Sequence, residues 1–498
     1  MKKLCFLLVL LLSLCGCGKA LPEETVSQTT AGAETAELSP EERFVRIDIY
    51  AINDLHGRIL DTGTQPGIEE LSTYLREARE TENAIFLATG DMWQGTAESA
   101  LTGGALMTEW MNEMGFAAMT LGGHEYDWGE DRIRENAALA QFPFLALNIY
   151  NRETDTRADY CQSSLLLEIE GVQIGIIGAI GDCYNSVSAQ HTGGVCFKTG
   201  AELTALVKAE AESLRSQGAD FIIYALHDGH TVTTGDTEAL SVSAEAISGY
   251  YDTVLSGGYV DMVFEADSHY RYVLEDEEGI YHMQAGGNNK ALSHGAVILD
   301  KETGEHQVIC AELIPASGYQ YLTKDPATLA LLERHGDAIA SADRVLGTVP
   351  YRSGSAVCDL VAELYCDLGV KVWGGYDIVL GGGYLSCRSP GYLEAGEVTY
   401  GQLQSLLPFD NKIMLCSIRG RDLQSRFLET ENEAYHIYTT AYGDSLRGHI
   451  DPDGIYYLVT DSYTAEYTYN NLTVIDTYNE TTFARDLLAD YIEAGHLQ

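Results

Sequence analysis

The sequence predicts an α/β protein of two domains, and three observations lead to that fold class. The chain has 498 residues, which is too long for one ordinary hydrophobic core. Apolar residues make up 45% of it, which is ample for globular folding. Between residues 44 and 320, short apolar runs typical of strands alternate with amphipathic runs typical of helices, for example 69–80, 105–114 and 200–216. That alternation predicts a layered α/β domain.

The first 16 residues have the features of a bacterial lipoprotein signal peptide. Lys2 and Lys3 precede a short apolar stretch, and the segment ends Leu14-Cys15-Gly16-Cys17. The stretch is too short to remain in a bilayer as a spanning helix. The ending resembles a lipobox, which implies cleavage before Cys17, lipidation of its thiol and an extracytoplasmic protein anchored to the cell membrane through that lipid alone. The alternative is a simple secretory peptide with a chance cysteine.

Four further segments follow the signal peptide. Residues 17–43 are small and polar, which predicts a disordered tether. Residues 44–320 are expected to form the first domain. Residues 321–345 have a helical period after a proline and are expected to form a linker helix. Residues 346–498 contain a Gly-rich run and a Tyr-dense run and are expected to form a second, smaller α/β domain.

Five strand-like runs of the first domain end on side chains of metal-ligand type. In chain order these residues are Asp54, His56, Asp91, His124, Asp127, His227, Asp267 and His269. Ligands of open α/β sheets bind outside the carboxyl ends of the strands, so the five ends are expected to meet at one rim. A single Asp or His at a strand end is usually a loop cap or a solvated group. Five such ends favour a site for two metal ions, which suits phosphoester hydrolysis.

The charge balance argues against one class of partner. The chain has 30 Lys and Arg residues against 74 Asp and Glu residues, a formal net charge of −44. A surface this acidic repels nucleic-acid backbones, so no nucleic-acid duplex is expected as a partner. A small phosphate ester remains compatible, because bound divalent cations reverse the local field. The sequence leaves the oligomeric state open.

Most of the eight cysteines after Cys17 are expected to be small buried residues rather than disulfide partners. None of them forms a C-x-x-C pair, which argues against a zinc knuckle. Most lie in or beside apolar runs, such as those that end at Cys310 and Cys416. Their spacing leaves open whether any two form a disulfide.

The strand ends resemble the motifs of the calcineurin-like metallophosphoesterases, specifically the bacterial 5'-nucleotidase family. That family has D-x-H, G-D, G-N-H-E, an H with a nearby G, and G-H-x-H or G-H-x-Q. The corresponding stretches here are Asp54-Leu55-His56, Gly90-Asp91, Gly122-Gly123-His124-Glu125, His227-Asp228-Gly229-His230 and Asp267-Ser268-His269. The resemblance implies a layered β-sandwich flanked by helices.

The second domain extends the resemblance. Leu407-Pro408-Phe409-Asp410-Asn411 and Gly420-Arg421-Asp422-Leu423 are similar to stretches of the family's nucleotide-specificity domain. The whole resemblance covers residues 44 to 490, approximately. It implies a metal-dependent phosphoric ester hydrolase in which metal-activated water attacks nucleotides or related small phosphate esters.

By position, the resemblance implies two divalent metal ions, with Mn, Zn, Ca or Mg as the choices. The first ion would be held by Asp54, His56, Asp91 and His269. Asp91 would bridge to a second ion, which would also bind His227 and Asp267. His124, oriented by Asp127, would stabilise the phosphoryl transition state or protonate the leaving group.

Two departures from the family pattern fall on the second ion. Gly123 stands where the family has the Asn ligand, and Asp267 stands where it has the first His of G-H-x-H. A carboxylate can replace an imidazole on a hard divalent ion, whereas glycine has no side chain to donate. The first site is therefore expected to be intact, and the second weakened or retuned.

The substrate side departs further. Where the family has N-x-G-G-I-R, this chain has residues 380–385, which lack both the Asn and the Arg, and Arg388 is the nearest substitute. Phe409 with Tyr463 or Tyr467 is expected to stack on a base, with Asn411 beside them, although these aromatic residues are equally consistent with core packing.

Two functions remain open from the sequence. One is the phosphoesterase; the other is a ligand-binding lipoprotein derived from such an enzyme, with weak or no turnover. Gly123, Asp267, Leu380 and Leu385 favour the binding protein. Retention of His124, Asp127, His227 and the complete first site favours the enzyme.

Overall fold

The computed structural model describes residues 40–61, 66–181, 187, 191–232, 247–248, 259–276, 278–388, 390–429, 435–439, 446, 448–468, 471–479 and 481–497. The predicted signal peptide, the lipidation site Cys17, nearly all of the predicted tether and Cys183 lie outside these residues. None of the described helices combines the length and the apolar composition needed to cross a bilayer.

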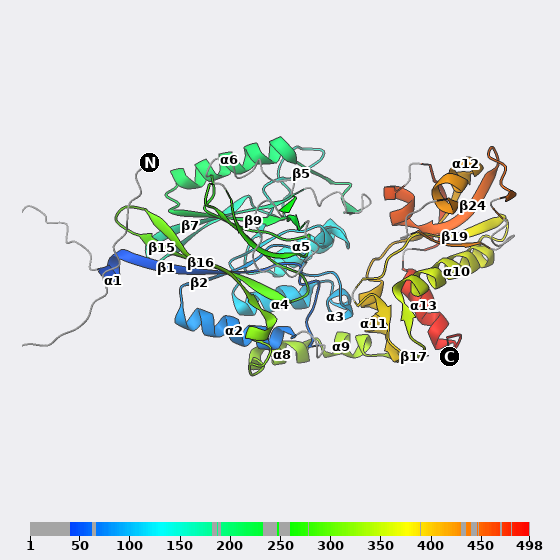
Figure 1. The fold of residues 1–498 in the computed structure, drawn as a ribbon, viewed down its shortest axis with the longest axis horizontal. Coiled ribbons are helices and arrows are strands. Elements are labelled where there is room, and N and C mark those ends of the chain that lie inside the picture. Colours follow the sequence, from blue (N-terminus) through cyan, green and yellow to red (C-terminus); the bar gives the residue numbers. More distant parts are fainter. Residues whose placement is uncertain are drawn as a thin grey trace, which may run out of the picture. The chain divides into compact units, whose positions relative to one another are not determined.

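The first domain contains two six-stranded sheets that pack face to face (Figure 1). In spatial order, the first sheet consists of β16 (His306–Pro315), β15 (Ala291–Asp300), β1 (Phe44–Ile52), β2 (Ala84–Ala88), β3 (Ala118–Thr120) and β4 (Phe144–Leu145). The second consists of β13 (Arg271–Glu275), β14 (Tyr281–Ala285), β12 (Met262–Phe264), β9 (Phe221–His227), β7 (Val172–Ile180) and β6 (Ser164–Ile169). Alternate apolar residues of the two inner faces, such as Ile47 and Ile176, share one buried cluster. The predicted layered sandwich is confirmed.

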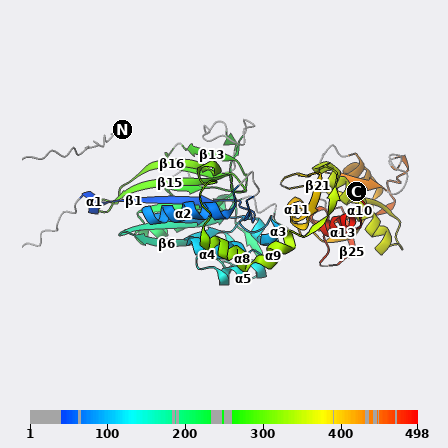
Figure 2. The same cartoon turned by 90° about the horizontal axis from the view of Figure 1, so that it is seen from below.

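Helices cover the outer faces of both sheets. Figure 1 shows α6 (Gly200–Ser216) on one side of the sandwich, and α2 (Ile68–Thr81) and α4 (Ala105–Met114) on the other. The structure confirms the predicted helices at 105–114 and 200–216 at both ends and extends the one at 69–80 by one residue each way. Figure 2 shows β1, β15 and β16 running side by side.

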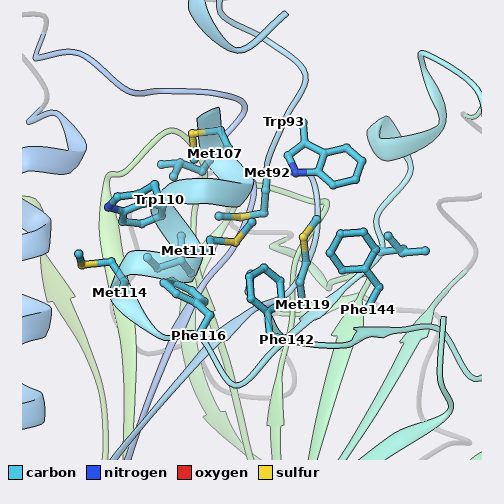
Figure 3. Packing of buried hydrophobic residues seen from close by; sticks show 14 of the residues in the cluster. Met92, Trp93, Met107, Trp110, Met111, Met114, Phe116, Met119, Phe142 and Phe144 are labelled. Carbon is cyan, nitrogen blue, oxygen red and sulfur yellow. The ribbon is translucent and has the colours of Figure 1, made fainter. Parts of the chain in front are cut away.

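The core between α4 and the first sheet is rich in methionine and aromatic residues. Figure 3 shows methionine side chains interleaved with the rings of Trp93, Trp110, Phe116, Phe142 and Phe144. Each large apolar side chain buried in this way contributes roughly 1.5–3 kcal/mol. Met92 and Trp93 belong to this cluster and are fully buried. The core therefore anchors the chain directly after Asp91.

The second domain is built on a five-stranded sheet in the order β23 (Tyr435–Thr439), β19 (Ile378–Tyr384), β24 (Ile455–Asp461), β22 (Ile413–Arg419) and β25 (Thr473–Thr477). The long helix α10 (Gly354–Val372) packs against β19 and buries residues such as Val357, Val361 and Tyr365. The Sγ atoms of Cys358 and Cys387 lie 3.7 Å apart, and neither cysteine forms a disulfide in the structure.

The predicted linker helix is two helices, α8 (Pro326–Arg334) and α9 (Gly336–Ala342). Asp325 caps the first, because its side chain accepts a hydrogen bond from the Thr328 backbone N–H. His335 leaves helical geometry, with φ −99° and ψ 20°, directly before Gly336. Glycine has low helix propensity, which accounts for the break at this point.

A buried charged network joins the neighbouring strands β12, β14 and β13 of the second sheet. Glu265 follows β12, accepts a hydrogen bond from the Tyr272 hydroxyl, and lies 2.9 Å from His282 Nδ1 on β14. His282 Nε2 lies 3.3 Å from Asp276 Oδ2. Gln284 Nε2 donates to Tyr272 Oη, which ties the network together. His230 Nε2 lies 3.4 Å from Glu265 Oε1, so the network contains three imidazole–carboxylate contacts.

This network predicts a pH-dependent stability. Burial disfavours the His282 cation, but Glu265 and Asp276 outweigh burial and raise the pKa of His282 to about 9. Because the folded pKa lies above the unfolded value of about 6.5, the stabilisation is complete below that pH and is lost as pH rises through 9. The free energy of unfolding of the wild-type protein should therefore fall across this window by more than that of His282→Gln, with a difference on the order of 1–3 kcal/mol. Equal slopes for both proteins would contradict the prediction; His306→Gln, at a partly exposed strand start, is the control.

Candidate metal centre

The predicted ligands converge at the carboxyl ends of four strands from both sheets. Asp54 and His56 follow β1, Asp91 follows β2, His227 ends β9, and Asp267 and His269 follow β12. Potential ligand atoms lie within 4.8 Å of one another in two groups, and Asp54 belongs to both. The groups are Asp54–His56–His269 and Asp54–Asp91–His227. The strand ends therefore meet at one rim.

The backbone adopts a rare conformation at most of these ligands. Among the described residues, nine non-glycine residues have positive φ. Five of them are predicted metal ligands: Asp54 (48°), His56 (51°), Asp91 (55°), Asp267 (64°) and His269 (58°). Left-handed backbone costs a non-glycine residue roughly 1 kcal/mol or more, and such residues cluster at functional sites where the surroundings over-determine them. This concentration of strain marks the rim as a functional site.

Two glycines allow the ligands to approach closely. A Cβ on Gly90 would lie 2.4 Å from His227 Nδ1, and one on Gly122 would lie 2.4 Å from Asp91 Oδ1. Gly90 also has φ +97°, which disfavours any other residue. The glycines of the G-D and G-G-H-E motifs are thus required by the packing of the ligands.

Backbone carbonyls fix the tautomers of two histidines. His56 Nδ1 lies 2.9 Å from the Gln94 carbonyl oxygen, and His227 Nδ1 lies 2.6 Å from that of Thr89. Since a carbonyl only accepts, each Nδ1 carries a proton, and each Nε2 is directed into the cluster. His56 Nε2 lies 3.1 Å from His269 Nε2, and His227 Nε2 lies 3.3 Å from Asp91 Oδ1. Metal-binding histidines are oriented in this way, so these residues fit divalent ions.

The electrostatics also favour a cation. Burial opposes the charge of His227, yet Asp91, Asp54 and Asp267 raise the pKa of His227 well above its usual range. Burial likewise opposes ionisation of Asp91, but the surrounding imidazoles hold the pKa of Asp91 well below its usual value. The Asp91 carboxylate therefore stays ionised and attracts positive charge.

From the sequence, Glu125 was assigned no role, but the structure shows that this residue has one. Glu125 is fully buried and accepts backbone N–H bonds from Asp91 (2.8 Å), Met92 (2.8 Å) and Gly122 (2.7 Å). It therefore fixes the turn that carries Asp91. Its place at the end of the G-G-H-E motif was the feature of the sequence that could have indicated this role.

The second ion's predicted ligands are less fully assembled. Within the described part of the chain, the Asp267 carboxylate belongs to neither ligand group, although the Asp267 N–H donates to Asp54. Burial raises the pKa of Asp267 to about 6, against the opposing effect of His227. The roles of Asp267 as a ligand and of Asp91 as the bridge stay predictions.

Gly123 has helical geometry, with φ −64° and ψ −44°. Among the described residues, an added Cβ would meet only Val187 Cγ2, at 3.4 Å. Any residue can adopt this backbone, so neither strain nor these neighbours requires glycine here.

His124 lies beside the ligands with its predicted partner. Its Nδ1 lies 2.8 Å from Asp127 Oδ2, its Nε2 lies 4.0 Å from Asp91 Oδ2, and its ring stacks on Phe409 at 5.6 Å. Burial opposes the charge, but Asp127 and Asp91 raise the pKa of His124 to about 9. The imidazole is therefore protonated at neutral pH and can donate a proton.

A cavity of about 230 Å³ opens beside His124 and Asp127. Four of the five predicted substrate residues line it: Arg388, Phe409, Asn411 and Tyr463. The side chain of the fifth, Tyr467, lies outside the described residues. The Phe409 ring stacks on His124, and the Arg388 guanidinium lies 5.0 Å from the centre of the same ring. The Tyr463 ring contacts that of Tyr384.

Two lining residues were missed in the sequence. Tyr384 and the buried Asp461 face the same cavity, and burial raises the pKa of Asp461 to about 6. Tyr384 lies within the stretch 380–385, whereas no motif marks Asp461, and the pairing of β19 with β24 brings the two residues to the cavity.

Comparisons with known proteins agree with this geometry. No family model matches the sequence. The chain is 27% identical over 327 residues to a 5'-nucleotidase of Diplobatis ommata, covering 62% of this chain and 55% of that protein, about half its length. It is 24% identical over 514 residues to Protein UshA of Yersinia enterocolitica, covering 90% of each chain.

The fold is similar to a solved structure of a 5'-nucleotidase precursor from Thermus thermophilus. The TM-score is 0.66 at 16% identity, covering 91% of this chain and 96% of that one. Fold, rim geometry and sequence relatives agree, and together they support a calcineurin-like metallophosphoesterase of the 5'-nucleotidase family.

Proposed function

We propose that this protein is a metal-dependent phosphoesterase that hydrolyses nucleotides or related small phosphate esters. The observation that carries the proposal is the convergence of Asp54, His56, Asp91, His227 and His269 at one rim beside a protonatable His124. Divalent ions held by these ligands would polarise the phosphoryl group and lower the pKa of water. The named relatives support a nucleotide as the substrate class.

Residues of the protein itself would donate the proton and bind the phosphate group. Asp127 holds the His124 ring, so that Nε2 points towards the rim and can donate a proton to the leaving oxygen. Arg388 is exposed, lies over Phe409 and lines the cavity, where its guanidinium suits a phosphate oxygen. Leu380 is fully buried in the core of the second domain and cannot replace the family's Asn.

The binding-protein alternative rests on Gly123. A rim with one fewer ligand would hold the second ion less tightly and could leave a protein that captures a phosphate ester with little turnover. The complete Asp127–His124 pair favours the enzyme, because a pure binder has no need of a positioned proton donor.

The His124→Ala variant tests the enzyme directly. General acid catalysis contributes about 10²–10⁴-fold, so kcat on a nucleoside monophosphate should fall by that factor. The loss should be smaller on an aryl phosphate, whose leaving group needs no proton. Phosphate release with Mn²⁺, Zn²⁺, Ca²⁺ or Mg²⁺ is the measurement, and His306→Ala is the matched control.

Equal losses of kcat on both substrates would indicate that His124 stabilises the phosphoryl oxygens in the transition state and does not protonate the leaving group. If no ion gives turnover and His124→Ala changes nothing, the enzyme proposal is wrong. Thermal stabilisation by a nucleotide that is never consumed would then support the binding protein.

The Gly123→Asn variant tests whether the second ion is weakened. The backbone there accepts any residue, so an amide ligand should raise affinity for the second ion by about tenfold, roughly 1.4 kcal/mol. Calorimetric titration with Mn²⁺ on the metal-free protein measures this. Gly193→Asn, where an added Cβ meets nothing within 4 Å, is the control. Two ions bound equally tightly in the wild-type protein would refute the weak second site.

We also propose that the protein is an extracytoplasmic lipoprotein, supported by the sequence around Cys17. In bacterial cells, Cys17→Ala should abolish labelling by a fatty-acid analogue and shift the protein out of the membrane fraction. Cys161→Ser, in the protein body, should change neither. A labelled Cys17→Ala variant would exclude lipidation at this thiol.

A further inference from the structure

One cluster outside the catalytic rim has the ligand set of a different metal site. His294 on β15 and Cys310 and Glu312 on β16 offer an imidazole nitrogen, a thiol sulfur and a carboxylate oxygen within 4.8 Å of one another. His294 Nδ1 lies 3.2 Å from Glu312 Oε1 and 3.9 Å from Cys310 Sγ. Neighbouring ligands of a tetrahedral zinc ion are separated by roughly 3.3–3.6 Å, given bond lengths of about 2.0–2.3 Å. Small side-chain shifts would thus close the site.

The strand register places all three groups on one face. His294 lies directly opposite Glu312, and Cys310 lies opposite Ala296, two residues further along the same face. On the other side of β15, Tyr50 lies opposite His294, and Asp48 lies opposite Ala296. The constellation therefore follows from the pairing of three adjacent strands and needs no loop to form.

The second ring nitrogen of His294, Nε2, contacts a carboxylate, as is common in metal-binding histidines. His294 Nε2 lies 2.9 Å from Asp48 Oδ1, and Asp48 is 1% exposed and paired with Arg46 by two 2.7 Å hydrogen bonds. The Tyr50 ring stacks on the imidazole at 4.5 Å with an interplanar angle of 6°. A carboxylate on one ring nitrogen fixes the ring and directs the other nitrogen towards an ion. Here that other nitrogen, Nδ1, faces Cys310 and Glu312.

We propose that His294, Cys310 and Glu312 bind a borderline divalent transition-metal ion, with Zn²⁺ as the best match and water at the fourth position. Thiolate and imidazole ligands favour zinc over magnesium or calcium. Glu312 has a 57% exposed side chain, which gives an ion access from solvent. Binding releases the Cys310 thiol proton and any Nδ1 proton to solvent. The ion would tie the edge strand β16 to β15, and through Asp48 to β1.

Cobalt substitution distinguishes this site from the catalytic rim, because none of the rim ligands is a cysteine. The metal-free full-length protein is titrated with Co²⁺, and the thiolate-to-cobalt charge-transfer absorption in the near ultraviolet is recorded. The wild-type protein should show this absorption, and Cys310→Ser should lose it together with one equivalent of bound zinc. Asp48→Asn should keep the absorption but bind Co²⁺ about 10–100-fold more weakly.

Cys161→Ser is the matched control, because Cys161 is also half-buried and its Sγ contacts only carbonyl oxygens among the described partners. It should retain the absorption and the zinc content. Zn²⁺ should also protect Cys310 from alkylation, read by peptide mass analysis, which tests the wild-type protein without any variant. No thiolate absorption in the wild type, or an absorption that survives in Cys310→Ser, would overturn the site. Phosphate release by Cys310→Ser reports separately on the proposed function.

Discussion

The candidate metal centre depends on left-handed backbone at the ends of parallel strands. A residue that leaves a strand with positive φ turns its side chain back across the strand end, so ligands from neighbouring strands can reach a common point. Asp54, Asp91 and Asp267 all adopt this geometry, and Asp is among the residues that tolerate it best. The strain persists because packing on either side leaves the chain no alternative. Met92 and Trp93 anchor one side of the Asp91 turn, and the buried Glu125 carboxylate accepts its backbone N–H groups on the other.

The same rim separates two kinds of histidine. His56 and His227 donate Nδ1–H to backbone carbonyls and direct Nε2 among carboxylates. His124 donates Nδ1–H to Asp127, a carboxylate outside the ligand groups. A carbonyl fixes a tautomer without adding charge, whereas a carboxylate also stabilises the imidazolium. In the proposed mechanism, the acceptor behind each ring therefore distinguishes the metal ligands from the proton donor.

The two metal-binding sets proposed for this protein also differ in ligand type. The catalytic rim offers carboxylates and imidazoles, and the β15–β16 cluster adds a thiol. A hard ion and a borderline ion could therefore occupy one protein without competing for one site. The net charge of −44 favours cations of both kinds over the whole surface, but only ligand geometry selects between them.

Much of this protein was determined by local sequence. The period of apolar residues predicted α4 and α6 to the residue, and the ends of strand-like runs contain the five side chains of the two ligand groups. These features depend on near neighbours, so the sequence contains them directly. Local sequence did not predict the break at His335. The helical period of the apolar residues continues across this position, although His335 itself leaves helical geometry.

Tertiary structure alone decided which distant groups meet. Cys310 was expected to be a small buried residue, but the register of β15 with β16 places it beside His294. Tyr384 and Asp461 reach the cavity only because β19 pairs with β24. Glu125 belongs to a recognised motif, but its role became evident only from its hydrogen bond with the backbone N–H of Asp91. Sequence fixes the type and local spacing of side chains, whereas strand pairing sets the distances between residues far apart in the chain, and the chemistry of a site depends on those distances.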